Sequence, residues 1–576
     1  MTICTVLIAT VVMPMKPTSV EKTAAAELED ALRHIGGAPA TWTYHVGATE
    51  KSRMAFGENP EWRWDEIGIK TQGDEIVLDG HPTRGQLYAV YTYLEDVLGV
   101  RWWTSTETDW PKTVPDKIPH LDLRFAPRIR YRETYYQDGF DPVFKARLKG
   151  NFSSRTRYMF KGLKRIPVEM GGDSTLLYHT RRSSSYHTFF EVLPPAVHFK
   201  AHPEWYSLVD GKRCCGETGQ LCLTNPEMER AFVDEMRRLL RANPDVDFVQ
   251  ISQNDGPGAC ECKSCRAVEA DEGGAHSGPV LRFVNRVAAE LEGEFPDVMF
   301  DTFAYKYTRK PPKKTCPRRN VTIRLCDIEC DFRRPLAELP ANAGFMADLA
   351  GWKRIAEGQL FFWDYVANFS SYIMPHPNFR SLASNIRLFA DAGAIGVFEQ
   401  GDALCDAGEF WPLRQWMIGH LLWNPTRDET SLEKEFLSGY YGMSAGPVLK
   451  RYLDLICTEA ARGTNAVHCY HANVNAFLSD AVMARSLALM NEAVAAAEKD
   501  GPVFARRVRR ERLSTDHMRL MNWKALGEKG DLSSAVAKWY SDIADFGVTA
   551  VFETTKRDAP EDYRRLIEKG AHGSQR

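Results

Sequence analysis

Acidic side chains recur at the ends of short apolar segments along this chain of 576 residues. Such segments are followed by Asp255, by the run from Asp327 to Asp331, by Asp364 and by Glu399. Glycoside hydrolysis needs one protonated carboxylic acid for the leaving oxygen and one ionised carboxylate that attacks the anomeric carbon or activates water. If the fold brings these acids together, at least one pKa must rise, because like charges held close resist ionisation. The alternative for each acid is a structural role, as a loop cap or as the partner of an arginine.

Aromatic and polar side chains accompany the acids and could bind a sugar. Flat rings stack on apolar faces, and a few well-placed polar groups fix the orientation of a ligand. We therefore predict substrate-binding roles for Asp364, Trp363, Tyr365, His187, Trp205, Asn254, Gln400 and Trp411. The alternative is that the rings fill the core and that the histidine is structural.

Three cysteines close to Asp255, namely Cys260, Cys262 and Cys265, form a C-x-C-x-x-C motif. Three thiolates within six residues could hold a structural zinc ion, which needs one further ligand. The candidates for that ligand are Cys214, Cys215, Cys222 and His276. The alternatives are reduced thiols or a disulfide. A catalytic metal is not indicated, so we expect no cofactor to be required for the chemistry.

The segments that carry these residues alternate with amphipathic helices between residues 126 and 425. Strands are predicted at Ile129–Thr134, Gly150–Ser153, Tyr186–Glu191, Phe248–Gln253, Val298–Phe303, Val321–Ile328, Leu360–Tyr365 and Ala394–Glu399. Eight strands alternating with helices are typical of a (β/α)8 barrel of the TIM type, which carries its reactive groups at the C-terminal ends of the strands. The acids, together with Glu133 near the end of the first strand, would then share one opening.

The position of each acid on this predicted barrel suggests its role. Asp255, after the fourth strand, is the predicted general acid/base. Glu399, at the end of the eighth strand, is the predicted nucleophile. Glu329, after the sixth strand, is the main alternative for the same role. Asp364 would position the substrate or tune the pKa of the other acids.

Two further domains are expected in this α/β protein. Residues 1–125 form an N-terminal α/β domain, whose first helix begins with a capping box made by Thr18 and Glu21. Residues 426–576 are almost wholly helical in pattern and few residue types suited to catalysis cluster there. We expect this C-terminal helical domain to pack on the barrel.

Composition narrows the possible partners. The net charge of −3 and the isoelectric point near 6.6 lack the basic excess of nucleic-acid-binding proteins. The longest apolar stretch, from Cys4 to Met15, is too short to span a bilayer and lacks the basic start of a signal peptide. We therefore expect no nucleic-acid partner and no membrane span. The protein is either cytoplasmic or exported with its signal absent from this chain, and the sequence does not indicate its oligomeric state.

Several motifs together resemble a bacterial family first described as a domain of unknown function. The matching segments are His202–Tyr206, Gln220–Pro226, Ser252–Asp255 with the C-x-C-x-x-C motif, Trp363–Tyr365, Gly396–Gly401 and Leu422–Pro425. Members of this family are placed in glycoside hydrolase family 163. The resemblance implies an N-terminal domain like those of hexosaminidases and α-glucuronidases, followed by a catalytic barrel. It also implies a metal-independent, retaining endo-β-N-acetylglucosaminidase that acts on N-glycans or glycoproteins.

Two other functions remain open at this point. One is an exo-acting hydrolase related to α-glucuronidases, in which Arg or Lys side chains reach a carboxylate on the substrate. The other is a carbohydrate-binding protein whose barrel has lost catalysis. Several clustered acids argue against the second, since a binding site has little reason to keep carboxylates that are costly to bury.

Overall fold

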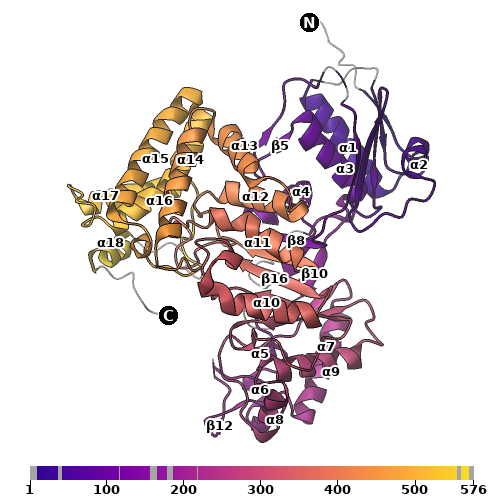
Figure 1. Cartoon of the computed structure of the whole chain (residues 1–576), viewed down its shortest axis with the longest axis vertical. Coiled ribbons are helices and arrows are strands. Elements are labelled where there is room, and N and C mark those ends of the chain that lie inside the picture. Colours follow the sequence, from indigo (N-terminus) through magenta and orange to yellow (C-terminus); the bar gives the residue numbers. More distant parts are fainter. Residues whose placement is uncertain are drawn as a thin grey trace.

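The computed structural model describes residues 9–36, 42–115, 117, 119–155, 165–177, 186–216, 218–553 and 560–569. A parallel barrel occupies the middle of the molecule (Figure 1). The N-terminal α/β domain and the C-terminal helices lie beyond one side of the barrel in this view, and a small lobe built from residues 186–242 and 251–291 projects from the other side.

The N-terminal part is a sheet flanked by helices. Its strands are β1 (Thr10–Val12), β2 (Thr43–Val46), β3 (Ile67–Gln72), β4 (Glu75–Gly80) and β7 (Asp122–Phe125), and its helices are α1 (Ser19–His34), α2 (Glu50–Phe56) and α3 (Gly85–Tyr93). The strand order is β1-β2-β4-β3-β7, and a separate ribbon pairs β5 (Arg101–Trp102) with β6 (Thr108–Asp109). The predicted capping box is present: Thr18 accepts from the backbone of Glu21, whose side chain accepts from the backbone N–H of Thr18.

Eight parallel strands form the nearly closed barrel. They are β8 (Tyr131–Tyr135), β9 (Phe152–Arg155), β10 (Ser174–Leu177), β13 (Phe248–Gln250), β14 (Met299–Ala304), β15 (Val321–Cys326), β16 (Leu360–Tyr365) and β17 (Gly396–Gln400). Their order is β8-β17-β16-β15-β14-β13-β10-β9. The TIM-type arrangement expected from the sequence is therefore confirmed, with one error. The third strand is β10, whereas the segment predicted as a strand at Tyr186–Glu191 leads into the short helix α5 (Phe189–Val192).

Side chains complete the join between β8 and β9. Only one backbone hydrogen bond, from Asn151 N–H to Arg132 C=O at 3.1 Å, links them within the described residues. The side chain of Asn151 accepts from Arg132 N–H at 2.9 Å, and Glu133 accepts from the N–H and hydroxyl of Ser154 at 2.9 and 2.8 Å. Glu133, expected at the barrel opening with the other acids, therefore closes the barrel instead.

Helices cover the barrel and build the lobe. The barrel helices are α4 (Pro142–Arg147), α10 (Ala343–Ile355), α11 (Phe379–Asp391) and α12 (Trp411–Trp423). The lobe contains α5, α6 (Pro195–His198), β11 (Leu208–Val209), β12 (Lys212–Arg213), α7 (Pro226–Ala242), α8 (Lys263–Asp271) and α9 (Ser277–Leu291). Helix α7 starts as its sequence dictates, because Asn225 caps it and Pro226 occupies its first turn.

The C-terminal part is helical. Its helices are α13 (Glu429–Tyr441), α14 (Gly446–Arg462), α15 (Asp480–Asp500), α16 (Pro502–Met521), α17 (Leu532–Asp545) and α18 (Pro560–Lys569). Loops of this part reach the C-terminal end of the barrel, where Phe369 N–H donates to Cys469 C=O and Tyr372 N–H donates to Val551 C=O, both at 2.8 Å. C-terminal segments therefore border the barrel opening.

A buried ion pair ties the N-terminal sheet to the barrel. Asp65 accepts from Arg84 at 2.8 Å and from Arg132 of β8 at 2.7 Å, and Asn151 donates to the same carboxylate at 2.8 Å. All four side chains are buried. Because one buried carboxylate is shared by Arg84 of the N-terminal part and Arg132 of the barrel, it links the two parts in a fixed geometry.

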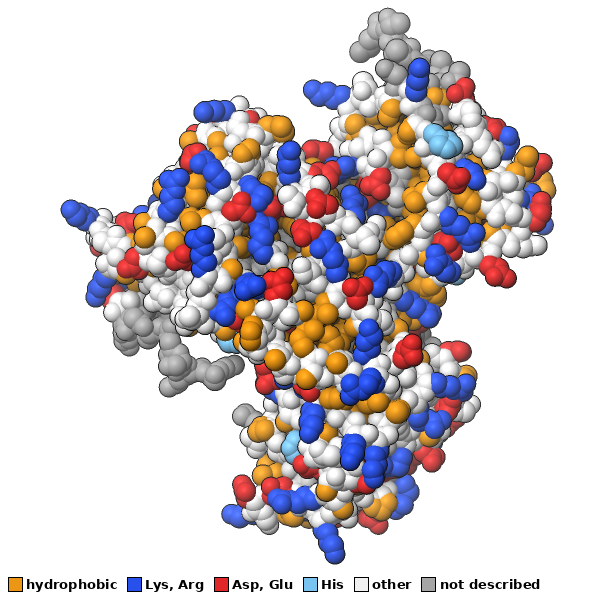
Figure 2. All heavy atoms as spheres, viewed as in Figure 1, with side chains coloured by type: hydrophobic (Ala, Val, Ile, Leu, Met, Phe, Trp, Pro, Cys, Tyr) orange, Lys and Arg blue, Asp and Glu red, His pale blue; other side chains and the backbone are white. Residues whose placement is uncertain are grey.

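Charged side chains of both signs are mixed on the surface that faces the viewer in Figure 2. Across the described part of the chain, no helix has the length and apolar character needed to cross a bilayer.

Candidate active site

Three carboxylates meet at the C-terminal ends of the neighbouring strands β15, β16 and β17. Asp364 and Glu399 are directly paired in the register of β16 and β17, and Asp327 follows β15 immediately. Their exposed fractions are 1%, 0% and 1%, respectively. Among the described residues, no donor outside this group is placed to hydrogen-bond their carboxylate oxygens. We call Asp327, Asp364 and Glu399 the acid triad.

Burial and mutual repulsion raise the pKa of each acid in the triad. Burial is the larger cause for Glu399 and Asp327, and the charge of Asp364 adds to it, so both pKa values lie well above the usual range. Burial is also the largest cause for Asp364 and raises its pKa to about 6. Asp364 is therefore the acid of the triad best suited to ionise, whereas burial and its neighbours oppose the ionisation of Asp327 and Glu399.

Glu329 is the catalytic candidate predicted after β15, whereas the structure brings Asp327 to the triad. Glu329 is half exposed and pairs with Arg309 at 2.8 Å, an arginine that also holds Asp348 at 2.9 Å. The strand ends at Cys326, two residues earlier than predicted. The residue that directly follows a barrel strand is the one that reaches the opening, and this signal identifies Asp327.

Asp255 lies apart from the triad. It follows β13, which is four strands from β17 in the barrel, so Asp255 and Glu399 belong to opposite sides of the opening. Its carboxylate accepts from Tyr305 and Lys306 at 2.9 Å each. Partial burial raises the pKa of Asp255, but Lys306 and the nearby His187 outweigh it and keep this pKa below its usual value. Asp255 is therefore ionised, which is the opposite of what proton donation requires.

Two predicted binding residues flank Asp255. His187 Nε2 lies 3.8 Å from the Asp255 carboxylate, and His187 Nδ1 lies 2.6 Å from the carbonyl of Gln253. Asn254 is used structurally, because its amide donates to Gly219 C=O at 2.8 Å and its carbonyl oxygen accepts from Phe190 N–H at 3.3 Å. His187 therefore borders the Asp255 side of the opening, and Asn254 fixes the loop beneath it.

Aromatic side chains lie on the strand face opposite to the triad. Trp363 and Tyr365 flank Asp364 on β16, with their rings stacked at 5.9 Å, and successive side chains of a strand point to opposite faces. The indole N–H of Trp363 donates to Gln400 at 2.8 Å, and Gln400 in turn donates to Glu553 at 3.3 Å. The predicted binding residues Trp363, Tyr365 and Gln400 therefore lie together in the barrel interior, whereas Asp364 shares the outer face of β16 with Phe362, whose ring stacks on Phe389 of α11.

Two of the predicted aromatic residues are elsewhere. Trp205 belongs to the lobe, where its ring stacks on His202 at 4.1 Å and its carbonyl accepts from the N–H of Cys222. Trp411 is buried at the start of α12, with the guanidinium of Arg510 5.6 Å from its ring centre. Within the described residues, neither tryptophan forms a hydrogen bond with Asp327, Asp364 or Glu399.

The C-x-C-x-x-C motif gains a fourth cysteine in the structure. Cys222, Cys260, Cys262 and Cys265 place their sulfurs within 4.8 Å of one another. Cys214 and Cys215 are not part of this group. His276 is not part of it either, because it forms an ion pair with Glu269 at 3.2 Å.

The fold and the acids define a class, namely TIM-type barrel proteins with a carboxylate cluster at the C-terminal end of the strands. Within that class the chain belongs to the family described as a domain of unknown function, DUF4838, whose model matches residues 102–454. No curated protein matches the sequence.

Solved structures with the same architecture include two glycoside hydrolases. One is a family GH115 4-O-methyl-α-glucuronidase with specificity for decorated arabinogalactans; it has a TM-score of 0.56 and 11% identity and covers 96% of this chain and 78% of its own. The other is a GH138 enzyme targeting pectin rhamnogalacturonan II, with a TM-score of 0.51, 11% identity, and coverage of 93% and 74%. The TM-scores indicate a shared fold, and identities of 11% support no conclusion beyond the fold.

Proposed function

We propose that this protein is a glycoside hydrolase whose chemistry depends on the acid triad. The observation that carries the proposal is the position of three buried carboxylates, with raised pKa values, at the C-terminal ends of successive barrel strands. Burying several acids without external hydrogen-bond donors is costly, and such clusters are typical of sites that exchange protons with a substrate. The shared fold with two glycoside hydrolases adds support.

The electrostatics favour a division of roles within the triad. Burial and the charge of Asp364 raise the pKa of Glu399, so its protonated form is favoured and is suited to protonate the leaving oxygen. Asp364, with a pKa of about 6, is ionised at neutral pH and is suited to act as the nucleophile or as the base that activates water. This division exchanges the roles expected from strand position alone, in which Glu399 was the nucleophile. Asp255, held ionised by Lys306, is suited to orient the substrate across the opening.

Access to the triad requires the side chains that cover it to move. Gln400 links Trp363 to Glu553, and the phenol of Tyr470 donates to the same glutamate at 3.0 Å. Tyr470 and Glu553 come from the C-terminal part, and 48% of Tyr470 is exposed. We propose that this contact yields when a glycan enters the barrel interior, and that Asp364 and Glu399, on the helix-covered face of the same strands, meet the sugar only if the strand ends also rearrange.

The finer proposal is a retaining endo-β-N-acetylglucosaminidase that acts on N-glycans without a cofactor. It is supported by the resemblance of the motifs around Asp255, Asp364 and Glu399 to glycoside hydrolase family 163. A retaining enzyme would need its two carboxyl groups about 5–5.5 Å apart. Directly paired residues on adjacent parallel strands, such as Asp364 and Glu399, are compatible with that spacing.

The test is to incubate the protein with an intact N-glycoprotein and with the released glycans, and to read the products by mass spectrometry. Cleavage within the chitobiose core, with the first product anomer retained by NMR, supports the finer proposal. Inversion would exclude the covalent intermediate. Binding of glycans without turnover, unchanged by Glu399→Gln, would instead indicate a carbohydrate-binding protein.

A second candidate is an exo-acting glycosidase for acidic sugars. Lys306 is 41% exposed beside Asp255 and is the kind of cation that could meet a substrate carboxylate. The fold shared with a 4-O-methyl-α-glucuronidase also favours this candidate. Release of glucuronic acid from an aryl α-glucuronide, with a raised KM in Lys306→Met, would support it. Activity on neutral aryl glycosides alone would exclude it.

A further inference from the structure

Four cysteines from two separate segments of the lobe meet at one point. Cys222 precedes α7, Cys260 follows the loop after β13, and Cys262 and Cys265 begin α8. Cys222 Sγ lies 3.6 Å from Cys262 Sγ and 3.9 Å from Cys265 Sγ. All four sulfurs lie within 4.8 Å of one another. Such convergence of distant cysteines is not produced by the motif itself and requires the folded lobe.

The spacing fits a single tetrahedral ion. A Zn–S bond of about 2.3 Å in a regular tetrahedron separates the sulfurs by about 3.8 Å. The two distances from Cys222 bracket this value. An iron–sulfur cluster would distribute the four cysteines over two or four iron atoms and spread the sulfurs further apart. The geometry therefore favours one metal ion over a cluster.

Donors around the sulfurs are arranged as thiolates require. Leu208 N–H donates to Cys260 Sγ at 3.3 Å, and Cys265 N–H donates to Cys262 Sγ at 3.5 Å. Arg213 Nη1 lies 4.0 Å from Cys260 Sγ. Four thiolates around a divalent cation leave two negative charges, and these N–H groups and the guanidinium offset them. An apolar group of neutral thiols has no need of such donors.

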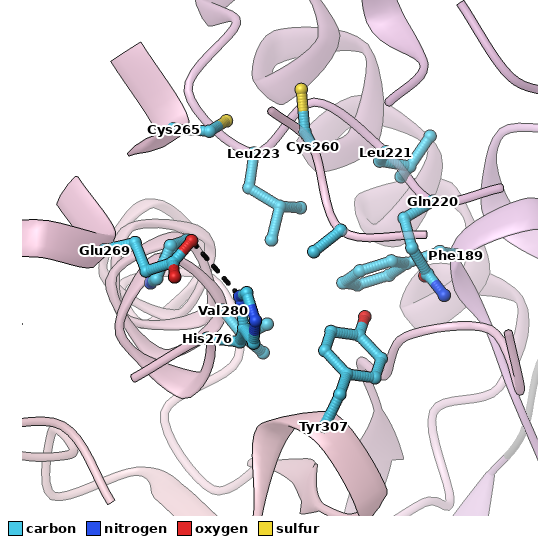
Figure 3. Close-up of a pocket in the computed structure, with 12 residues that line it drawn as sticks. Phe189, Gln220, Leu221, Leu223, Cys260, Cys265, Glu269, His276, Val280 and Tyr307 are labelled. Atoms are coloured by element: carbon cyan, nitrogen blue, oxygen red, sulfur yellow. Dashed lines mark ion pairs between the residues drawn. The ribbon is translucent and has the colours of Figure 1, made fainter. Parts of the chain in front are cut away.

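A small cavity beside the cysteines helps to define the ligand set. It is lined by Cys260, Cys265, Leu223, His276 and Tyr307 among others. Figure 3 shows His276 directed at Glu269 across the cavity, with the ion pair drawn between them, and not at either sulfur. His276, which the sequence left open as the fourth ligand, is thus engaged elsewhere.

We propose that Cys222, Cys260, Cys262 and Cys265 bind a structural Zn²⁺ ion. The ion closes its coordination sphere with four protein ligands and leaves no open position, as structural zinc sites do. Catalysis is not assigned to it. The proposal stands independently of the proposed glycosidase function.

The ion would fix the loop that presents Asp255. The segment before Cys222 runs beside this loop, since the Gln220 amide donates to Asn254 C=O at 2.9 Å and to Gly256 C=O at 2.7 Å. Gly258 N–H donates to Thr218 C=O at 3.0 Å. Zinc would link two neighbouring segments, the one before Cys222 and the loop around Asp255, to the start of α8. Its effect would therefore reach Asp255 and not β15, β16 and β17.

The experiment measures metal content and coordination in the intact chain. We expect about one zinc per chain by elemental analysis, in wild type and in the control variant Cys316→Ser, which alters an exposed cysteine outside the cluster. Cys262→Ser should lose most of the zinc. Protein reconstituted with Co²⁺ should show the thiolate charge-transfer and ligand-field bands of a tetrahedral S4 site, with Cys316→Ser unchanged.

A mercurial titration of the wild-type protein keeps the test valid if Cys262→Ser fails to fold. Stoichiometric release of zinc as thiols are modified supports the proposal. Three outcomes would overturn it: iron in place of zinc, zinc that is absent while the four thiols react freely in the folded protein, or disulfides among the four cysteines by mass spectrometry. None of these readouts depends on glycosidase activity.

Discussion

Asp364 and Glu399 occupy directly paired positions on the adjacent parallel strands β16 and β17, and both side chains are buried. Two carboxylates in this relationship cannot both ionise freely, so the pair holds one proton more readily than either acid would alone. A site that holds a proton next to a group able to ionise has the two states that acid/base chemistry needs.

Replacing Glu399 tests this pair. Glu399→Gln should lower kcat/KM by at least ~10³ on an accepted glycoside, because the loss falls on the transition state. Its melting temperature should stay unchanged or rise at neutral and alkaline pH, since the variant removes a group whose ionisation the fold opposes. The matched control is Glu338→Gln, which changes an exposed ion pair with Arg334 and should keep full activity. Near-wild-type rates in Glu399→Gln would remove the triad from the mechanism.

The stability of the protein should fall as the pH rises through the pKa of Asp402. Burial, followed by the charge of Asp406, raises the pKa of Asp402 to about 8, although Gly408 N–H donates to it at 2.6 Å. A carboxyl group with a raised pKa stabilises the fold fully below its unfolded pKa, and this contribution is lost as the pH passes the folded pKa.

Asp402→Asn should therefore flatten the dependence of the unfolding free energy on pH, as measured by urea denaturation below and above that pKa. Exposed Asp391, replaced by Asn, is the control and should leave the slope unchanged. A steeper slope in Asp402→Asn would show that this acid is ionised in the folded state.

Lys306 should control the ionisation of Asp255. Without its ammonium group, 2.9 Å away, the burial of Asp255 is opposed only by Tyr305 and His187, so the pKa of Asp255 should rise in Lys306→Met. If an ionised Asp255 orients the substrate, the acidic limb of the pH profile of kcat/KM moves to higher pH. Lys310→Met is a suitable comparison, because that lysine donates to a backbone carbonyl, Gly273 C=O, at 3.1 Å. An unmoved limb would exclude Asp255 from binding.

The ion pair between the N-terminal sheet and the barrel should carry a large share of the stability of their contact. Asp65→Asn leaves Arg84 and Arg132 buried with one fewer charge to meet them, and a loss of about 3–5 kcal/mol in the unfolding free energy is expected. In the same sheet, Asp122→Asn breaks only an exposed pair with Lys70, so it should cost little. Equal losses in the two variants would mean that Asp65 contributes no more than a surface pair.

The sequence predicted most of the barrel because short strand-like segments alternate with helical patterns, and β16 and β17 begin as apolar runs that stop at polar residues. It failed at the third strand for a physical reason. β10 is the short segment Ser174–Leu177, whereas the aromatic residues near Phe189 have strand propensity but pack in the lobe, where Thr188 and Phe189 N–H donate to Ser252 C=O. Propensity was overridden there by tertiary contacts.

The candidate site was predictable only in part. Residue types at strand ends identified Asp364 and Glu399. The fourth and eighth strands of an eight-stranded ring lie opposite each other, so the predicted strand order already separated Asp255 from Glu399. The predicted sixth strand was two residues longer than β15, so the acid that follows it in the prediction is Glu329 and not Asp327. Cys222 could not be selected among the candidate ligands, because its approach to Cys262 spans 40 residues of chain and depends on the folded lobe.

The join between β8 and β9 has a mechanical consequence. Seven of the eight interfaces around the barrel are formed by backbone hydrogen bonds between paired strands. The interface between β8 and β9 depends instead on side-chain hydrogen bonds of Asn151 and Glu133. Local opening is easiest where few backbone hydrogen bonds hold the strands together. Amide protons next to the interface between β8 and β9 should therefore exchange with solvent sooner than those of β15 and β16. Because β8 also pairs with β17, which carries Glu399, opening of this interface would leave the strands that hold the acids supported mainly from the β15 side.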